Sequence, residues 1–141
     1  MRPYLPAELP RLAPTRDDAA WWEALRRHEL TVQRCRACGT WRHPPSPICP
    51  ACRSSAARFE RVSGRGRVFS YTIVPHAVHP ALAGHLPYNV VLVELPDAGG
   101  VRLISNVVDV PPTDLRVGLE VEVVFEDLDD ATTLPRFRRA L

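Results

Sequence analysis

The chain has 141 residues, of which 45% are hydrophobic and 24% are charged, as is usual for a globular protein. This length suits one domain or two small ones, and the composition excludes the fibrous and intrinsically disordered classes. No apolar run approaches the roughly 18 residues that a transmembrane helix needs, and the first residues lack the apolar core of a signal peptide. We therefore expect no membrane segment and a cytoplasmic location.

Charge is divided unevenly along the chain. The net charge is +2, but residues 1–67 carry 13 arginines and 6 acids (+7), whereas residues 68–141 carry 5 arginines and 10 acids (−5). Either two modules have different surroundings, or the charges are scattered unevenly over one surface. The acidic second half disfavours nucleic-acid binding, because a phosphate backbone requires a basic surface.

The N-terminal region predicts an extended arm followed by a helix. Residues 1–14 contain four prolines, which prevent regular structure. Thr15 and Asp18 then match a capping box that would start a helix. One face of this helix carries three apolar side chains, Trp21, Trp22 and Leu25. That face must be buried, either against the rest of the chain or against a partner protein, because tryptophan is enriched at binding hot spots.

Four cysteines give the strongest chemical signal. They form two C-x-x-C pairs with ten residues between them, namely Cys35, Cys38, Cys49 and Cys52. Each pair places two thiolates on one tight turn, and two such turns suit the tetrahedral coordination of zinc. Disulfides are disfavoured in a cytosolic chain, whereas iron is a rival metal because a rubredoxin-like site has the same ligands. Four protein thiolates leave no open coordination position, so the predicted site is structural and not catalytic.

Strand patterns dominate the second half of the chain. Runs rich in β-branched and aromatic residues occur at 68–74, 88–95, 101–110 and 119–127, with a short closing strand at 134–137. The sequence PDAGG predicts a hairpin turn between the second and third runs. About five short strands after a separate ribbon favour a small barrel over a βαβ fold.

Other candidate sites carry weaker signals. His76 and His79 lie in a proline-containing stretch without a nearby acid, which favours a loop role over metal binding. The stretch Ser63–Gly66 could hold a phosphate, with Arg65 and Arg67 adding positive charge; a turn that opens the first barrel strand is the alternative. We find no nucleophile elbow, Walker loop or dinucleotide fingerprint, and therefore expect no catalytic residues in this chain.

The order of the motifs resembles a known family. A tryptophan-bearing helix precedes LTVQRCRACGTWRHPPSPICPAC, SGRGRVFSYTIV, PYNVVLVEL, DLRVGLEVEVVFED and TLPRFRR. In combination they resemble the acyl-CoA-associated OB-fold proteins with a rubredoxin-like zinc ribbon, a domain of unknown function. The resemblance implies a mainly β fold in three parts: an arm and helix at 1–29, a zinc ribbon at 30–59 and a five-stranded OB-fold at 60–141.

The same resemblance implies a function. Members of that family accompany thiolases, lipid-transfer-type aldolases and acyl-CoA hydratases as non-catalytic subunits. This chain would then be an accessory subunit in lipid or steroid degradation, in a hetero-oligomer such as a heterotetramer, with structural zinc on its four cysteines. A coenzyme A thioester would contact Trp41 and Arg42, with Arg65 and Arg67 as further phosphate contacts.

The sequence also allows two functions other than that of an accessory subunit. OB barrels and zinc ribbons both serve single-stranded nucleic-acid binding, through basic grooves with stacking aromatics. A free-standing enzyme is the other, but the sequence shows no convergent acid, base and nucleophile.

Overall fold

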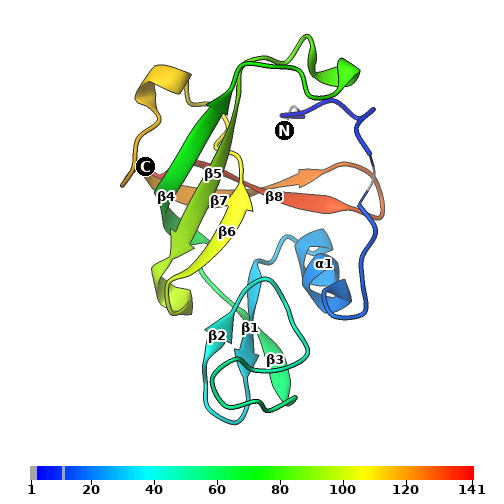
Figure 1. Ribbon diagram of the computed structural model, residues 1–141, viewed down its shortest axis with the longest axis vertical. Helices are drawn as coiled ribbons and strands as arrows, with labels where there is room; N and C mark the ends of the chain where they lie inside the picture. Colours follow the sequence, from blue (N-terminus) through cyan, green and yellow to red (C-terminus); the bar gives the residue numbers. More distant parts are fainter. Residues whose placement is uncertain (1–2, 11) are drawn as a thin grey trace.

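The computed structural model describes residues 3–10 and 12–141 (Figure 1). It contains one α-helix, α1 (Ala19–Arg26), and eight strands in two sheets. The first sheet holds β1 (Thr31–Cys35), β2 (Trp41–Arg42) and β3 (Ala57–Arg61). The second holds β4 (Arg65–Val74), β5 (Tyr88–Leu95), β6 (Val101–Ser105), β7 (Glu120–Asp127) and β8 (Thr133–Arg139). Short 3-10 turns lie at Pro80–Leu82, Pro96–Ala98 and Pro112–Asp114. The predicted mainly β fold is confirmed.

The N-terminal arm has neither helix nor strand over residues 3–10 and 12–14, as its prolines predict. Residues 1, 2 and 11 of the predicted arm lie outside the described residues. The arm is anchored to the barrel by Tyr4, whose backbone N–H donates to Glu126 Oε1 at 2.9 Å. The Tyr4 hydroxyl accepts the backbone N–H of Asn89, also at 2.9 Å. The arm is therefore part of the folded barrel surface.

Helix α1 begins at Ala19, later than the capping box at Thr15 predicts. The Asp18 carboxylate does accept the Thr15 N–H at 2.6 Å, which is one half of a capping box. Residues 16–18 nevertheless form a turn, and the first helical hydrogen bond runs from the Trp22 N–H to the Asp18 carbonyl. The predicted start is wrong because the motif closes a turn that precedes the helix.

The apolar face of α1 packs mainly inside the chain. Trp21 is 6% exposed and Leu25 is fully buried, and α1 contacts both β1 and β8. The Trp21 indole N–H donates to the Thr31 carbonyl at 3.0 Å. Trp22 is only half-buried. Of the three residues predicted for a partner interface, Trp22 is thus the one with accessible surface, because the other two belong to the core.

The first sheet is antiparallel in the order β2-β1-β3 and extends away from the barrel below α1 (Figure 1). Residues Leu30 and Val32 at its base join the same apolar core as Trp21. The ribbon base and the barrel therefore share one core, with α1 between them.

The second sheet curls into a five-stranded barrel in the order β6-β5-β4-β7-β8. A parallel bridge between Val107 and Phe137 closes it, supported by a 2.7 Å hydrogen bond from the Val108 N–H to the Phe137 carbonyl. Inward side chains fill the interior, including Val68, Val91, Val93, Val121 and Phe137. Closure through the segment after β6 and through β8 gives an OB-fold barrel, as predicted.

Strand β6 ends at Ser105, so the predicted strand over 101–110 is too long. The reason lies in Asn89 of β5. Its side-chain amide donates to the Val107 carbonyl and its Oδ1 accepts the Val107 N–H, both at 2.8 Å. The side chain of Asn89 thereby replaces the backbone of β5 as the partner of Val107. Beyond Ser105 the chain leaves β5 and reaches β8 through the Val107–Phe137 bridge. Strand β5 and the turn at 96–100, where Gly99 adopts a left-handed φ of 68°, match the sequence prediction.

Within the described ranges, no helix has the length and apolar character to cross a membrane.

Candidate metal centre

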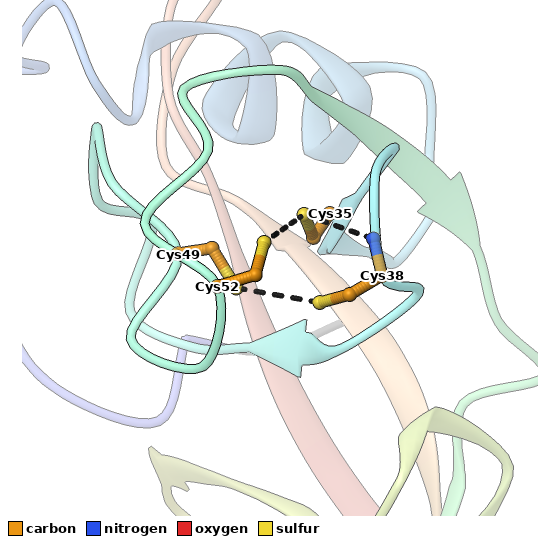
Figure 2. Close-up of side chains that lie close together, drawn as sticks. All are labelled: Cys35, Cys38, Cys49 and Cys52. Atoms are coloured by element: carbon orange, nitrogen blue, oxygen red, sulfur yellow. Dashed lines mark hydrogen bonds between the residues drawn. The ribbon is translucent and has the colours of Figure 1, made fainter.

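The two C-x-x-C turns bring four sulfur atoms together at the tip of the ribbon (Figure 2). All four lie within 4.8 Å of one another. Cys35 Sγ is 3.6 Å from Cys52 Sγ, and Cys38 Sγ is 3.6 Å from Cys49 Sγ. Each close pair joins one turn to the other, so an ion at the centre would cross-link the two turns.

The two turns have matching hydrogen bonds. The Cys35 N–H donates to the Thr40 carbonyl at 2.9 Å, and the Cys49 N–H donates to the Ser54 carbonyl at 2.9 Å. In each turn, the first cysteine is thus fixed by the residue five positions later. This repeated backbone geometry aims both cysteines of each turn at one point.

A left-handed residue follows each C-x-x-C pair. Gly39 has a φ of 78° and donates its N–H to the Cys35 carbonyl at 3.0 Å. Arg53 has a φ of 66° and donates to the Cys49 carbonyl at 2.9 Å. Glycine adopts this conformation freely, whereas arginine does so at a steric cost. The glycine at position 39 suits its left-handed conformation, whereas nothing in the sequence indicates the same conformation at Arg53.

The donor set fits zinc. Four sulfurs at about 2.3 Å from a tetrahedral zinc ion lie roughly 3.8 Å apart, close to the 3.6 Å of the two short pairs. The Cys38 amide N–H donates to Cys35 Sγ and lowers the pKa of Cys35 to about 6. The Cys52 amide lowers the pKa of Cys49 in the same way. Thiolate is the form that binds metal, so the cluster fits a structural zinc site, as the sequence predicts.

Trp41 and Arg34 connect the metal centre to its surroundings. The Arg34 guanidinium lies 4.5 Å from the centroid of the Trp41 ring, and its Nε donates to the Gly39 carbonyl at 2.9 Å. On the barrel side, a Cβ added to Gly99 would lie only 2.8 Å from Trp41 Cδ1. Trp41 therefore packs between the ribbon and the turn that follows β5.

Arg42, predicted to contact a ligand, is 6% exposed. Its Nη2 donates to the Ser46 carbonyl at 2.8 Å, and the Gln33 side chain binds the backbone of the same residue. Arg42 holds the loop between the two C-x-x-C turns, and its burial keeps it from an external phosphate.

Arg65 and Arg67 are exposed and line a cavity of about 240 Å³. Arg67 is paired with Glu94 at 2.6 Å, and Asp97 and Glu120 line the same cavity. The glycine of this stretch at position 66 has a packing role, because a Cβ there would lie 2.7 Å from the Glu94 carbonyl oxygen. The turn alternative explains this stretch better than a phosphate loop does.

A buried polar network beneath the arm has no sequence signal. Arg136 donates from Nε to Glu126 Oε2 at 2.6 Å and from Nη1 to Asn106. Asn106 donates to the Asn89 carbonyl, and Tyr4 binds both Glu126 and Asn89. In sequence these charges look like solvent-facing positions of two strands, yet Glu126 is 2% exposed. Nothing local reveals that their partners come from three other segments.

Two family descriptions match the chain. Residues 22–57 match "ChsH2, rubredoxin-like zinc ribbon domain", and residues 59–126 match "ChsH2, C-terminal OB-fold domain". The matches cover the second half of α1, the ribbon and all of the barrel except its last strand, β8. They agree with the family resemblance drawn from the sequence motifs.

Several curated proteins are similar to the chain. A "Probable enoyl-CoA hydratase alpha subunit" of Thermomonospora curvata is 42% identical over 132 residues, which are 94% of this chain and 40% of that protein. A "3-oxo-4,17-pregnadiene-20-carboxyl-CoA hydratase alpha subunit" of Mycobacterium tuberculosis is 35% identical, over 89% of this chain and 39% of that protein. The chain thus spans about 40% of the length of these two relatives. A "DUF35 domain-containing scaffold protein" of Methanocaldococcus jannaschii is 36% identical over 79% of this chain and 80% of its own length.

Two solved structures share the fold. A chain of the "Ltp2-ChsH2(DUF35) aldolase" is 42% identical with a TM-score of 0.83, covering 93% of this chain and 100% of that chain. A DUF35 protein of unknown function from Sulfolobus solfataricus has a TM-score of 0.64 at 17% identity, which supports the fold alone. With the ribbon, the barrel and full-length relatives in agreement, this chain belongs to the DUF35 family, which joins a ChsH2-type zinc ribbon to an OB-fold domain.

Proposed function

We propose that the chain is a non-catalytic accessory subunit of a lipid-degradation enzyme that acts on acyl-CoA thioesters. One observation carries the proposal: the chain matches the whole length of a chain of the Ltp2-ChsH2(DUF35) aldolase at 42% identity. Two hydratase alpha subunits among its relatives, one named for a steroid acyl-CoA, support the same substrate class.

The chemistry of the chain itself supports a non-catalytic role. A centre with four protein thiolates has no open position for water or substrate. Among the described residues, no histidine side chain hydrogen-bonds to a hydroxyl or thiol, so no nucleophile is paired with a base. His28 instead pairs with Asp127, and His79 accepts the Ala81 N–H at the start of a 3-10 turn. The partner enzyme would supply the reacting groups, and this chain would supply interface and stability.

The partner we propose is a thiolase-like or lipid-transfer-type aldolase, with an acyl-CoA hydratase as the alternative, in a cytoplasmic two-plus-two heterotetramer. Cys35, Cys38, Cys49 and Cys52 would hold structural zinc. The three-part division at 1–29, 30–59 and 60–141 belongs to the same proposal. For phosphate contact we retain Arg65, which is exposed and has no ion pair among the described residues. Trp22 would contribute to the partner interface.

Copurification tests this proposal. The tagged chain is isolated from its native cells, the bound proteins are identified by mass spectrometry, and the mass of the complex is measured by light scattering. We expect a thiolase-like, aldolase-like or hydratase-like enzyme in near-equal amount. The purified chain alone should show no turnover of acyl-CoA substrates, and robust turnover by it would overturn the proposal.

A binding measurement with nucleic acid distinguishes the accessory role from the main rival function, single-stranded nucleic-acid binding. Fluorescence anisotropy with a labelled single-stranded oligonucleotide should show no binding at low salt. Salt-dependent binding, the signature of phosphate contacts, would instead favour a nucleic-acid-binding OB-fold.

A further inference from the structure

A groove of about 490 Å³ lies where the arm, α1, the ribbon loop and the barrel meet. We call it the seam groove; its walls include Leu5, Trp22, Val90, Arg102, Ile104 and Leu134. The full lining comes from six separate segments, namely the arm, α1, the ribbon loop, β5, the stretch 102–106 and β8, which no sequence motif connects. Its volume falls within the range of roughly 300–1,000 Å³ that is typical of small-molecule sites.

The groove exists because β6 and β8 do not pair as strands along this seam. Proline has no N–H to donate to a ladder, and Pro135 of β8 faces β6 here. The Ser105 hydroxyl donates to the Pro135 carbonyl at 2.7 Å in place of a ladder bond. The side chain of Ile104 remains 71% exposed at the edge of the seam. An apolar surface is thus left open beside a rigid barrel wall.

The charged residues that line the seam groove are all basic. No aspartate or glutamate lines it, although residues 68–141 carry a net charge of −5. Arg136 at its base is neutralised by Glu126 at 2.6 Å. Arg102 has no carboxylate within ion-pair distance among the described residues, and its guanidinium lies 3.6 Å from the centroid of the Phe69 ring. The groove therefore combines apolar walls with one uncompensated cation.

The histidine that lines the groove, His43, carries no charge. His43 packs against Trp21, with 5.3 Å between the ring centroids. Burial lowers the pKa of His43 to about 4, so its imidazole is neutral at physiological pH. By contrast, the cavity at Arg65 and Arg67 carries charges of both signs, since Asp97 and Glu120 also line it.

We propose that the seam groove binds the apolar body of an amphipathic anion, with Arg102 facing its negatively charged group. Apolar walls, the absence of acids and a single arginine without a carboxylate partner match an acyl group attached to a charged head. A fatty carboxylate has its charge directly on the apolar body, whereas an acyl-CoA has the same apolar body and carries its negative charge on the phosphates of coenzyme A. The choice of ligand class rests on the proposed function.

Isoleucine methyl NMR on the zinc-loaded full chain tests the proposal. The sequence has three isoleucines: Ile104 in the groove, Ile48 at the ribbon tip and Ile73 in β4. Decanoyl-CoA, decanoate and coenzyme A are titrated separately into protein labelled at the isoleucine δ1 methyl groups. We expect decanoyl-CoA and decanoate to shift the Ile104 signal, while the Ile48 signal stays in place.

The three titrations identify the source of the anion. Tighter binding of decanoyl-CoA than of decanoate assigns the groove to thioesters, and equal binding assigns it to the acyl chain that the two ligands share. An Ile104 shift with coenzyme A alone would overturn the proposal, since the nucleotide and not the apolar body would then be recognised. Unchanged Ile104 in all three titrations would overturn it as well.

A charge-reversal pair tests the role of Arg102. Arg102→Glu should weaken decanoate binding at least tenfold, whereas Arg116→Glu, an exposed arginine away from the groove, should leave it unchanged. The Ile73 signal reports that each variant is folded. Equal affinities of the two variants would contradict the assignment of Arg102.

Different results test the ligand site and the accessory role. If the enzyme copurifies but no ligand shifts Ile104, the accessory role stands and the groove proposal falls. If adding the enzyme without ligand perturbs Ile104, the groove is a protein contact and the ligand proposal is overturned.

Discussion

Gly39 and Arg53 occupy the same place in the two metal-binding turns, but only one of them carries a Cβ. A methyl group added at Gly39 would make only ordinary contacts, 3.6 Å from Arg34 Nη2. The cost of Gly39→Ala is therefore that of a left-handed backbone, about 1 kcal/mol. Arg53→Gly should not lower the free energy of unfolding, because it removes the same strain. Urea denaturation with zinc present compares the two, and equal losses would contradict this view.

Asp127 makes the stability of the chain sensitive to acid. The Thr133 hydroxyl donates to its carboxylate at 2.6 Å, and His28 contacts it at 2.9 Å; both hold the pKa of Asp127 below its usual value. A carboxylate with a lowered folded-state pKa stabilises the fold above its unfolded pKa, and this contribution is lost as pH falls through the folded value. Thr133→Val should therefore flatten the loss of stability between about pH 5 and pH 3. Thermal unfolding across this range, with exposed Thr113→Val as control, checks the slope; an unchanged slope in Thr133→Val refutes it.

At the scale of elements, Asn89 decides where β6 ends. Asn89→Ala would leave the buried N–H and carbonyl of Val107 without partners, at a cost of about 2 kcal/mol or more. We expect the loss of amide protection to concentrate at Val108 and Phe137, which close the barrel. Hydrogen exchange by NMR measures this, with the exposed β4 variant Ser70→Ala as a matched control. A uniform loss of protection over all strands would argue against a local closing role.

The same element shows what sequence can and cannot predict. Strand β5 and the turn after it follow from alternation and turn residues within a few positions, and the cysteine spacing is equally local. The end of β6 depends on the Asn89 side chain, which lies 18 residues before Val107 in the sequence. The arm is anchored through Tyr4 to Glu126, which lies 122 positions later. The burial of Arg42 and the seam groove likewise arise from segments that meet only after folding.

For the whole molecule, metal removal should separate the ribbon tip from the barrel. The base of the ribbon shares the barrel core, whereas the tip at residues 35–56 depends on the four-sulfur cluster. Metal binding in such segments supplies the free energy of folding. Chelation should abolish amide protection in residues 35–56 and preserve it in β5 and β7, as measured by hydrogen-exchange mass spectrometry. Metal analysis before chelation should give one zinc per chain and no iron; collapse of the whole chain on chelation would contradict this division.

The contacts of Tyr4 also indicate when the arm joins the barrel during folding. Its two partners lie on β5 and β7, so its binding site does not exist until these strands share a barrel. A contact that closes so long a loop forms late, after the folding transition state. Tyr4→Phe removes one hydrogen bond, and its effect should fall on the rate of unfolding and leave the rate of folding nearly unchanged. Stopped-flow measurements of both rates check this. A faster unfolding rate with an unchanged folding rate means that the arm detaches before the barrel opens, so that the contacts of Tyr4 set the lifetime of the native barrel.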